Sequence, residues 1–278
     1  MAKTVCVIAS THNPRIFWNR DNADEQDLAE LEEAFGVLRA GLAEAAPDAI
    51  VVVANDHLDN FFFDNLPSFA VGTGPVAEGP FWYESEIMHL PSYRCAVHQD
   101  LAQDVLRRGA ENGIPFSQVH EFKIDHAFTL PLSYVRPEQD IPIVPIISNA
   151  FGYPIPNTRR WYALGELIGE VIHARPADER IAVIGSFNLT VEVGGPKMGN
   201  YNQDFNRWVI RQMSDGAKDT ILDSLSVPRL IREGNSTAEF LNYVTVLGVV
   251  ADRKPDFIRH KPVRGVGTCP VALWKGVA

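Results

Sequence analysis

The chain has 278 residues, of which 46% are hydrophobic and 22% are charged, an ordinary composition for a globular protein with a large core. Its formal net charge of −10 makes a nucleic acid an unexpected partner, because an acidic surface repels phosphate backbones. No apolar run approaches bilayer length, and the first residues lack a basic stretch followed by a long apolar one. We therefore expect neither a membrane span nor a signal peptide.

The first half of the chain alternates short apolar runs with helical patterns. Residues 5–9 and 50–54 are predicted to be buried strands. Between them, residues 24–46 carry large apolar side chains at three- and four-residue steps, which indicates an amphipathic helix. Residues 60–95 are rich in Phe, Pro and Gly and are predicted to be long connecting structure. A helix is predicted over residues 99–113, where it ends at a glycine.

The second half continues the same alternation. Residues 141–147 and 181–185 are predicted to be the third and fourth strands, and residues 263–274 a late strand or a loop. The predicted helical segments are residues 157–173, 200–214, 217–233 and 237–249.

Strands that alternate with helices predict an α/β fold, with a central mixed sheet flanked by helices in a single domain over residues 1–278. Sites in such folds lie beyond the carboxyl ends of the strands. His12 follows the first predicted strand, His57 follows the second, and residues 190–196 follow the fourth. We therefore expect these polar loops to meet at one edge of the sheet.

The three cysteines indicate a reducing compartment. Cys6, Cys95 and Cys269 match no zinc-binding spacing, and three thiols cannot all pair within one chain. Reduced thiols are typical of reducing compartments, so we expect a cytoplasmic protein.

Two histidines in equivalent places suggest a metal site. A lone loop histidine is usually just solvated, but His12 and His57 both directly follow buried strands. Asn13 beside His12, and Asn55 and Asp56 beside His57, are polar groups that can orient an imidazole. The pattern therefore favours two metal ligands as strongly as two solvated side chains.

Glu239 is the candidate for a third ligand. It begins a predicted helix after residues 234–238, where the positive end of the helix favours an anion. An ordinary first-turn glutamate is the alternative, and the residue pattern leaves both open. Two histidines and one carboxylate leave three octahedral positions vacant, a set that suits Fe(II) oxygen chemistry and also tolerates Mn(II).

At these residues the chain resembles the class III extradiol dioxygenases, the family of the protocatechuate 4,5-dioxygenase β-subunit, over nearly its full length. The resemblance implies that His12, His57 and Glu239 take the iron-ligand positions and that His126 takes the position of a histidine lining the substrate pocket. A histidine held by Asp125 for structure alone is the other interpretation of His126. The motifs that carry the resemblance are Ser-Thr-His-Asn-Pro at 10–14, Asn-Asp-His at 55–57, Ile-Asp-His-Ala-Phe-Thr-Leu-Pro at 124–131, the stretch 149–160, Gly-Gly-Pro-Lys-Met-Gly at 194–199 and Asn-Ser-Thr-Ala-Glu at 235–239.

The chain departs from the family where an acid–base histidine is expected. The family reads Gly-Gly-Leu-Ser-His, whereas residues 187–191 are Phe-Asn-Leu-Thr-Val, so Val191 stands at the base position and cannot transfer a proton. The departure implies that another base acts, or that an acidic substrate binds as an anion. Glu192 is adjacent, but in an extended segment it would point to the opposite side. We favour His126 as the base.

The resemblance implies a non-haem Fe(II) enzyme that uses O₂ to cleave the ring of a small catechol-like or hydroxylated heteroaromatic substrate, such as a hydroxypyridone. Because the usual histidine is missing, the alternative is a related metal-binding protein or a metal-dependent hydrolase without oxygenase chemistry. A homo-oligomer or a small lid subunit is expected to complete the pocket. Segments that resemble the family's pocket lining supply the candidate substrate residues Tyr153, Asn188, Thr190, Val191, Glu192 and Thr268.

Overall fold

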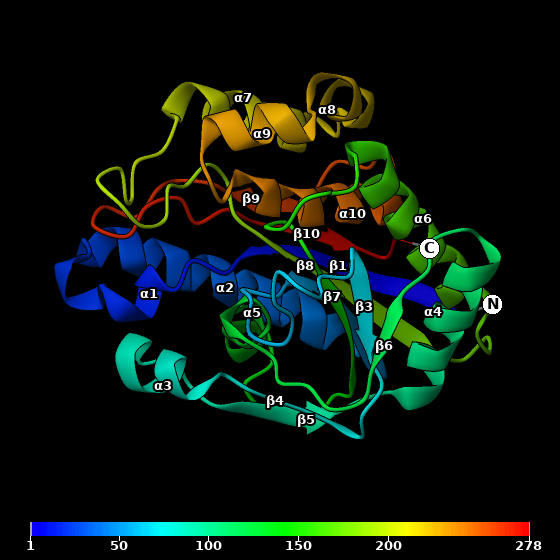
Figure 1. The fold of residues 1–278 in the computed structure, drawn as a ribbon. Coiled ribbons are helices and arrows are strands. Elements are labelled where there is room, and N and C mark those ends of the chain that lie inside the picture. The colour runs from blue at the N-terminus through cyan, green and yellow to red at the C-terminus, as the bar shows by residue number, and fades with distance from the viewer. Residues whose placement is uncertain (1, 278) are drawn as a thin grey trace.

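The computed structural model of the protein describes residues 2–277, and over those residues it is built around one mixed sheet of eight strands (Figure 1). Along the sheet the order is β6, β3, β7, β2, β8, β1, β10, β9. In chain order these strands are β1 (Lys3–Thr11), β2 (Ala49–Asn55), β3 (Phe69–Gly72), β6 (Ser117–Val119), β7 (Ile143–Ser148), β8 (Arg180–Phe187), β9 (Phe257–Arg259) and β10 (Val271–Lys275). A separate two-stranded sheet pairs β4 (Val76–Gly79) with β5 (Tyr93–Ala96).

Four adjacent parallel strands form the centre of the sheet. β7, β2, β8 and β1 run in one direction, and Val51 of β2 pairs with Val144 of β7 on one side and with Val183 of β8 on the other. β3 and β10 join antiparallel at the two sides of this group. The parallel strands correspond to the four predicted from their apolar runs, and their carboxyl ends meet at a single edge of the sheet.

Helices cover both faces of the sheet, which confirms the predicted fold class. α4, α6 and α10 pack on one face and α2 and α5 on the other, while α7, α8 and α9 lie outside α10 (Figure 1). The longer helices are α2 (Glu25–Ala45), α4 (Gln99–Glu111), α5 (His126–Val135), α6 (Thr158–Ala174), α7 (Gln203–Asp215) and α10 (Leu241–Val250). The shorter ones are α1 (Arg15–Trp18), α3 (Trp82–Met88), α8 (Lys218–Ser224) and α9 (Val227–Glu233), with 3₁₀ turns η1 (Arg20–Asn22) and η2 (Thr237–Phe240).

Within residues 2–277 no helix has both the length and the apolar character to pass through a bilayer. Cys6, Cys95 and Cys269 are free thiols, and all three are buried.

The structure differs from the sequence-based predictions in residues 60–95, in α5 and in residues 217–233. Residues 60–95 contain β3, β4, α3 and β5, which are too short to give a recognisable period. α5 was not predicted, because Pro131 stands inside it and a proline normally ends a helical pattern; Asp125 caps its start. Residues 217–233 form two helices instead of one, with Pro228 in the first turn of α9.

α6 and α10 approach closely through two glycines. A methyl group on Gly165 would overlap the carbonyl oxygen of Thr245, and one on Gly248 would overlap that of Tyr162. α10 begins two residues after Glu239, so this backbone-to-backbone packing sets where Glu239 can lie.

We predict that Gly165→Ala destabilises the protein by about 1–3 kcal/mol, because the added methyl forces the two helices apart. The matched control is Gly169→Ala in the same helix, where a Cβ meets nothing within 4 Å. That variant should stabilise by about 0.5–1 kcal/mol through helix propensity alone. Urea unfolding of both variants measures the difference, and equal effects would contradict the packing argument.

Candidate metal centre

The strand ends bring His12, His57 and Glu239 together. His12 follows β1, His57 follows β2, and Glu239 lies in η2 at the entry to α10. The Nε2 atom of His12 is 2.9 Å from Oε2 of Glu239, and Nε2 of His57 is 3.5 Å from Oε1. His12 and Glu239 are buried, and His57 is partly exposed to the cavity above. Two imidazoles therefore face one buried carboxylate.

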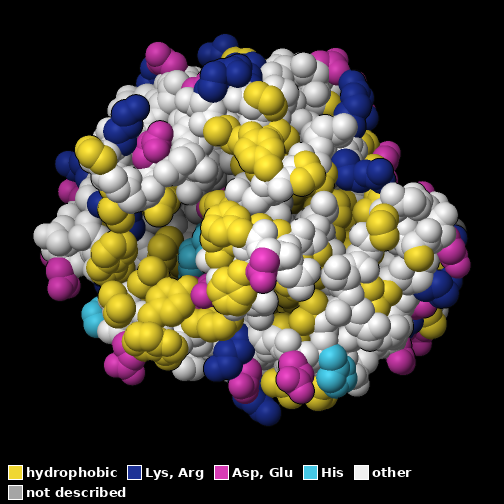
Figure 2. All heavy atoms as spheres, in the orientation of Figure 1, with side chains coloured by type: hydrophobic (Ala, Val, Ile, Leu, Met, Phe, Trp, Pro, Cys, Tyr) yellow, Lys and Arg dark blue, Asp and Glu magenta, His cyan; other side chains and the backbone are white. Residues whose placement is uncertain are grey.

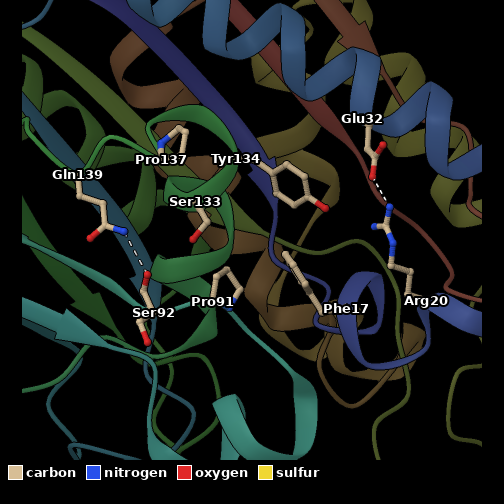
Figure 3. Close-up of a pocket in the computed structure, with 9 residues that line it drawn as sticks. All are labelled: Phe17, Arg20, Glu32, Pro91, Ser92, Ser133, Tyr134, Pro137 and Gln139. Atoms are coloured by element: carbon tan, nitrogen blue, oxygen red, sulfur yellow. Dashed lines mark hydrogen bonds and ion pairs between the residues drawn. The ribbon is translucent and has the colours of Figure 1, made fainter.

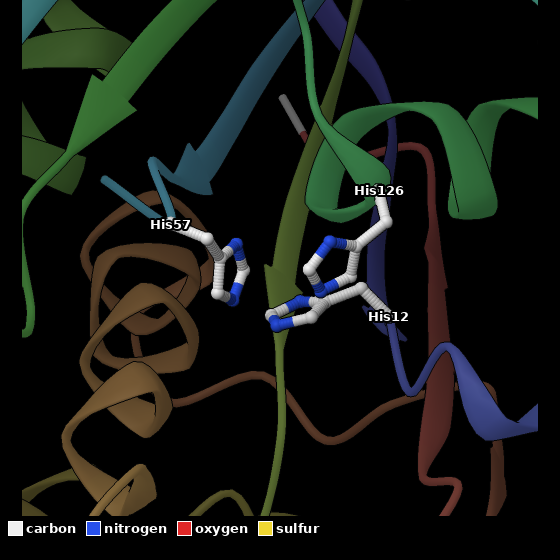
Figure 4. Close-up of side chains that lie close together, drawn as sticks. All are labelled: His12, His57 and His126. Atoms are coloured by element: carbon white, nitrogen blue, oxygen red, sulfur yellow. The ribbon is translucent and has the colours of Figure 1, made fainter. Parts of the chain in front are cut away.

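His126 joins this group from the first turn of α5. Its ring centroid is 4.0 Å from that of His57 and 5.6 Å from that of His12 (Figure 4). Ring nitrogens of all three histidines lie within 4.8 Å of one another, close enough to hold one metal ion. In Figure 4 the three rings converge from three separate elements.

Carboxylates hold the Nδ1 atoms of His57 and His126. Nδ1 of His57 is 2.8 Å from Oδ2 of Asp125, which also accepts the backbone N–H of His57. Nδ1 of His126 is 2.5 Å from Oε1 of Glu84, which again accepts the backbone N–H of the same histidine. Because an ionised carboxylate only accepts, each Nδ1 carries a proton and each Nε2 faces the centre.

His12 is oriented by a chain of hydrogen bonds that starts at a proline. Pro131 has no N–H, so the carbonyl of Ala127, one helical turn earlier, has no partner within α5. The hydroxyl of Ser186 donates to that carbonyl at 2.5 Å. Its oxygen then lies 2.8 Å from Nδ1 of His12 and accepts the Nδ1 proton, which leaves the lone pair on Nε2.

The orienting groups predicted beside the histidines are wrong. The side chain of Asn13 accepts from the N–H of Arg15, and the carboxylate of Asp56 accepts from Asn60 and the N–H of Phe61. Asn55 bonds Ser148 and Asn242. The sequence neighbours of His12 and His57 bond other groups, so the partners of each imidazole come from other elements.

Of the true partners, only one carried a sequence signal. Asp125 immediately precedes His126, and an acidic residue beside a histidine is a visible feature, but the interpretation that Asp125 holds His126 is wrong. Its carboxylate bonds Nδ1 of His57, and Glu84 holds His126. Ser186 is an ordinary strand residue, and Glu84 lies in α3, inside the segment predicted to be connecting structure. Neither of the two stands near a histidine in the sequence.

The buried charges shift the pKa of each group in the direction its neighbours dictate. Burial disfavours the Glu239 carboxylate, but His12 and His57 outweigh burial and hold the pKa of Glu239 well below its usual range. Burial also opposes a charge on His57, yet Asp125 and Glu239 raise the pKa of His57 well above 6.5. For His12 burial wins and lowers the pKa. In the metal-free site His57 therefore favours its protonated form, and a bound cation would have to displace that proton.

The group lies at the bottom of a cavity of about 320 Å³. Figure 2 shows a histidine recessed in a hollow whose rim is largely hydrophobic. The apolar lining includes Trp18, Met88, Phe151, Val191, Val193 and Met198. Such a cavity accommodates a small, mostly apolar ring above the imidazoles.

Four of the predicted substrate residues line this cavity: Asn188, Val191, Glu192 and Thr268. Glu192 would point away from Val191 only in an extended segment; residues 188–193 are irregular, and both side chains line the cavity.

The other two predicted substrate residues lie elsewhere. Thr190 is fully buried, and its hydroxyl bonds Asn206 and the N–H of Asn202. Tyr153 is 73% exposed and lines a separate groove with Asn157 and Arg159. Neither residue lines the histidine cavity, because the resemblance of a segment to the family does not fix the direction of each side chain.

A second cavity of about 340 Å³ lies away from the histidines, beside α2 and the end of α5 (Figure 3). Phe17 and Tyr134 form part of its wall, and Arg20 donates to Glu32 at 2.5 Å across one side. Its charges are already paired, and no histidine lines it. The candidate site is therefore the histidine cavity.

We predict that His57 and His12 titrate differently in the metal-free protein. His57 should stay protonated at pH 7, while His12 stays neutral with its proton on Nδ1. Because the folded pKa of His57 is raised, its ion pairs stabilise fully below the unfolded value of 6.5. That stability is lost as pH rises through the folded pKa. Asp125→Asn keeps a cap for α5 but should lower the pKa of His57. Long-range ¹H–¹⁵N spectra measure both rings, and unchanged titration of His57 in the variant would refute this account.

Comparisons with known proteins identify the family of the chain. Residues 6–270 match the model of a family described as the catalytic LigB subunit of aromatic ring-opening dioxygenase. The 2,3-dihydroxyphenylpropionate/2,3-dihydroxicinnamic acid 1,2-dioxygenase of Photorhabdus laumondii is 28% identical over 198 residues, which cover 70% of this chain and 59% of that protein. The corresponding dioxygenase 1 of Pseudomonas putida is 29% identical over 172 residues, 62% of this chain and 52% of that protein.

The chain therefore spans little more than half the length of these relatives. A crystal structure of an uncharacterized protein from Escherichia coli K12 superimposes with a TM-score of 0.58 at 18% identity, over 97% of this chain and 99% of that one, which shows a shared fold. The match over residues 6–270 confirms the resemblance seen in the motifs. The chain belongs to the family of LigB catalytic subunits of aromatic ring-opening dioxygenases.

Proposed function

We propose that the chain is a non-haem Fe(II)-dependent extradiol dioxygenase that opens the ring of a catechol-like or hydroxylated heteroaromatic substrate, such as a hydroxypyridone. The observation that carries the proposal is the convergence of two Nε2 atoms on the buried Glu239 carboxylate at the bottom of an apolar cavity. The names of the relatives describe substrates whose rings carry adjacent hydroxyls, and this supports a catechol as the substrate class.

The donor atoms of His12, His57 and Glu239 fit a divalent metal. Each imidazole presents an unprotonated or exchangeable Nε2 while its Nδ1 is held by a neighbour, as metal-ligating histidines usually are. Two imidazoles and one carboxylate suit Fe(II), and Mn(II) is the alternative. A bound Fe(II) would supply Lewis-acid and redox chemistry towards O₂ and a ring with adjacent hydroxyls.

The chain's own residues then position the ring and handle its protons. The apolar wall excludes water from the substrate and limits its orientations. Nε2 of His126 accepts the proton of a substrate hydroxyl, and the Glu84 carboxylate on Nδ1 stabilises the imidazolium that results. Val191 also borders the cavity and takes no part in proton transfer.

The first test is oxygen uptake after anaerobic Fe(II) loading. With a panel of catechols and hydroxypyridones, the parent should bind stoichiometric iron and consume one O₂ per ring opened, with a coloured product. Glu239→Ala and His57→Ala should lose both iron and oxygen uptake. Tyr153→Phe, outside the cavity, is the matched control and should behave as the parent. Stoichiometric metal without oxygen uptake on any diol would instead favour a hydrolase or a metal-binding protein, an alternative raised by Val191.

We predict that His126→Gln lowers kcat by about two to four powers of ten, the usual contribution of a positioned acid–base group. Iron content should stay at the parent value, because His126 is not one of the proposed ligands. Single-turnover kinetics and metal analysis of the same preparation measure both quantities. Loss of iron from this variant would make His126 a ligand and overturn its assignment as the base.

A further inference from the structure

Asn188 joins Glu239 to the end of the first strand. It directly follows β8, and it is 8% exposed at the wall of the cavity. Its amide Nδ2 donates to Oε2 of Glu239 at 2.9 Å. Its Oδ1 accepts from the hydroxyl of Thr11 at 2.9 Å. A single side chain therefore bridges the carboxylate and β1.

The orientation of the Asn188 amide is fixed from both ends. The hydroxyl of Thr11 accepts the backbone N–H of Asn13, so its own proton is free to point at Oδ1 of Asn188. In the flipped orientation, two acceptor oxygens, Oδ1 of Asn188 and Oε2 of Glu239, would face each other. The amide nitrogen therefore belongs beside Glu239, and Thr11 keeps it there.

The contacts of Glu239 separate into two kinds. Among residues 2–277, its carboxylate meets the side chains of His12, His57 and Asn188. The two histidines are its proposed fellow ligands, and a cation between the three replaces their direct contacts. Asn188 is then the side chain that continues to hold the carboxylate.

We propose that Asn188 is a positioning residue, which keeps Glu239 in the orientation that a metal ion requires and is itself set by Thr11. The inference rests on the proposed function in one respect, the role of Glu239 as a ligand. Partners that orient a ligand usually contribute about ten- to hundred-fold to metal affinity. In the motif resemblance Asn188 stands where the family reads glycine, and its amide contacts the carboxylate of Glu239.

The test is the affinity of the full chain for Mn(II) and Co(II), measured by competition with a chelator. Asn188→Leu and Asn188→Gly should each weaken binding by about ten- to hundred-fold. Thr11→Val, which keeps the shape but removes the hydroxyl, should weaken it less. Asn206→Ala is the matched control, because Asn206 is also buried and bonds Thr190 of the same segment without touching Glu239.

A second readout separates positioning from general loosening. The visible spectrum of the Co(II)-loaded protein should change in Asn188→Leu and stay as in the parent for Asn206→Ala. If Asn188→Leu does not fold, Asn188→Gly and Thr11→Val carry the same comparison. Parent-like affinity and spectrum in the Asn188 variants, with binding lost in Glu239→Ala, would overturn this inference and leave the metal site standing. Full affinity in Glu239→Ala would overturn the metal site itself.

Discussion

The structure depends on one buried carboxylate that faces two imidazoles. An ionised glutamate in a protein interior is costly unless positive charge or donors surround it. Glu239 is 3% exposed; the amide of Asn188 donates to it and the ring of His57 lies 3.5 Å away, while the unprotonated Nε2 of His12 faces it with a lone pair. The neighbours that offset the free-energy cost of burying the carboxylate also place it to bind a divalent cation, since a cation can take the place of the proton on His57.

Specific pairing and packing interactions place each element that brings Glu239 and the histidines together. Parallel β1 and β2 deliver the two histidines to one edge of the sheet. The glycine contact between α6 and α10 brings η2 down onto that edge. Pro131 leaves a carbonyl of α5 without a partner, and Ser186 uses it to orient His12. A residue that usually breaks helices thus contributes to the tautomer of a proposed ligand.

The sequence predicted the four central strands of the sheet and placed two histidines after them, and physical reasons explain why it predicted no more. His12 and His57 were predictable because apolar runs mark the strands they follow. Glu239 depended on the family resemblance, since a first-turn glutamate is common and its partners lie more than 180 residues away in the chain. Glu84 gave no signal because α3 is a seven-residue helix in a segment without periodicity. The sequence misplaced Thr190 and Tyr153 in the substrate pocket, because the direction of a side chain in an irregular loop is set by tertiary contacts.

The absence of a histidine at Val191 narrows the choice of a proton acceptor. Apart from the proposed ligands, the ionisable side chains that line the cavity are Arg15, Tyr83, His126 and Glu192. A guanidinium does not release its proton in proteins. Burial and its hydrogen bond to Asp59 raise the pKa of Tyr83, which makes this phenol a poorer acid than usual. Glu192 belongs to the irregular segment at the mouth, whereas His126 touches the ring of His57 and is backed by a buried carboxylate. Its place beside His57 and its fixed orientation therefore favour His126 as the proposed proton acceptor.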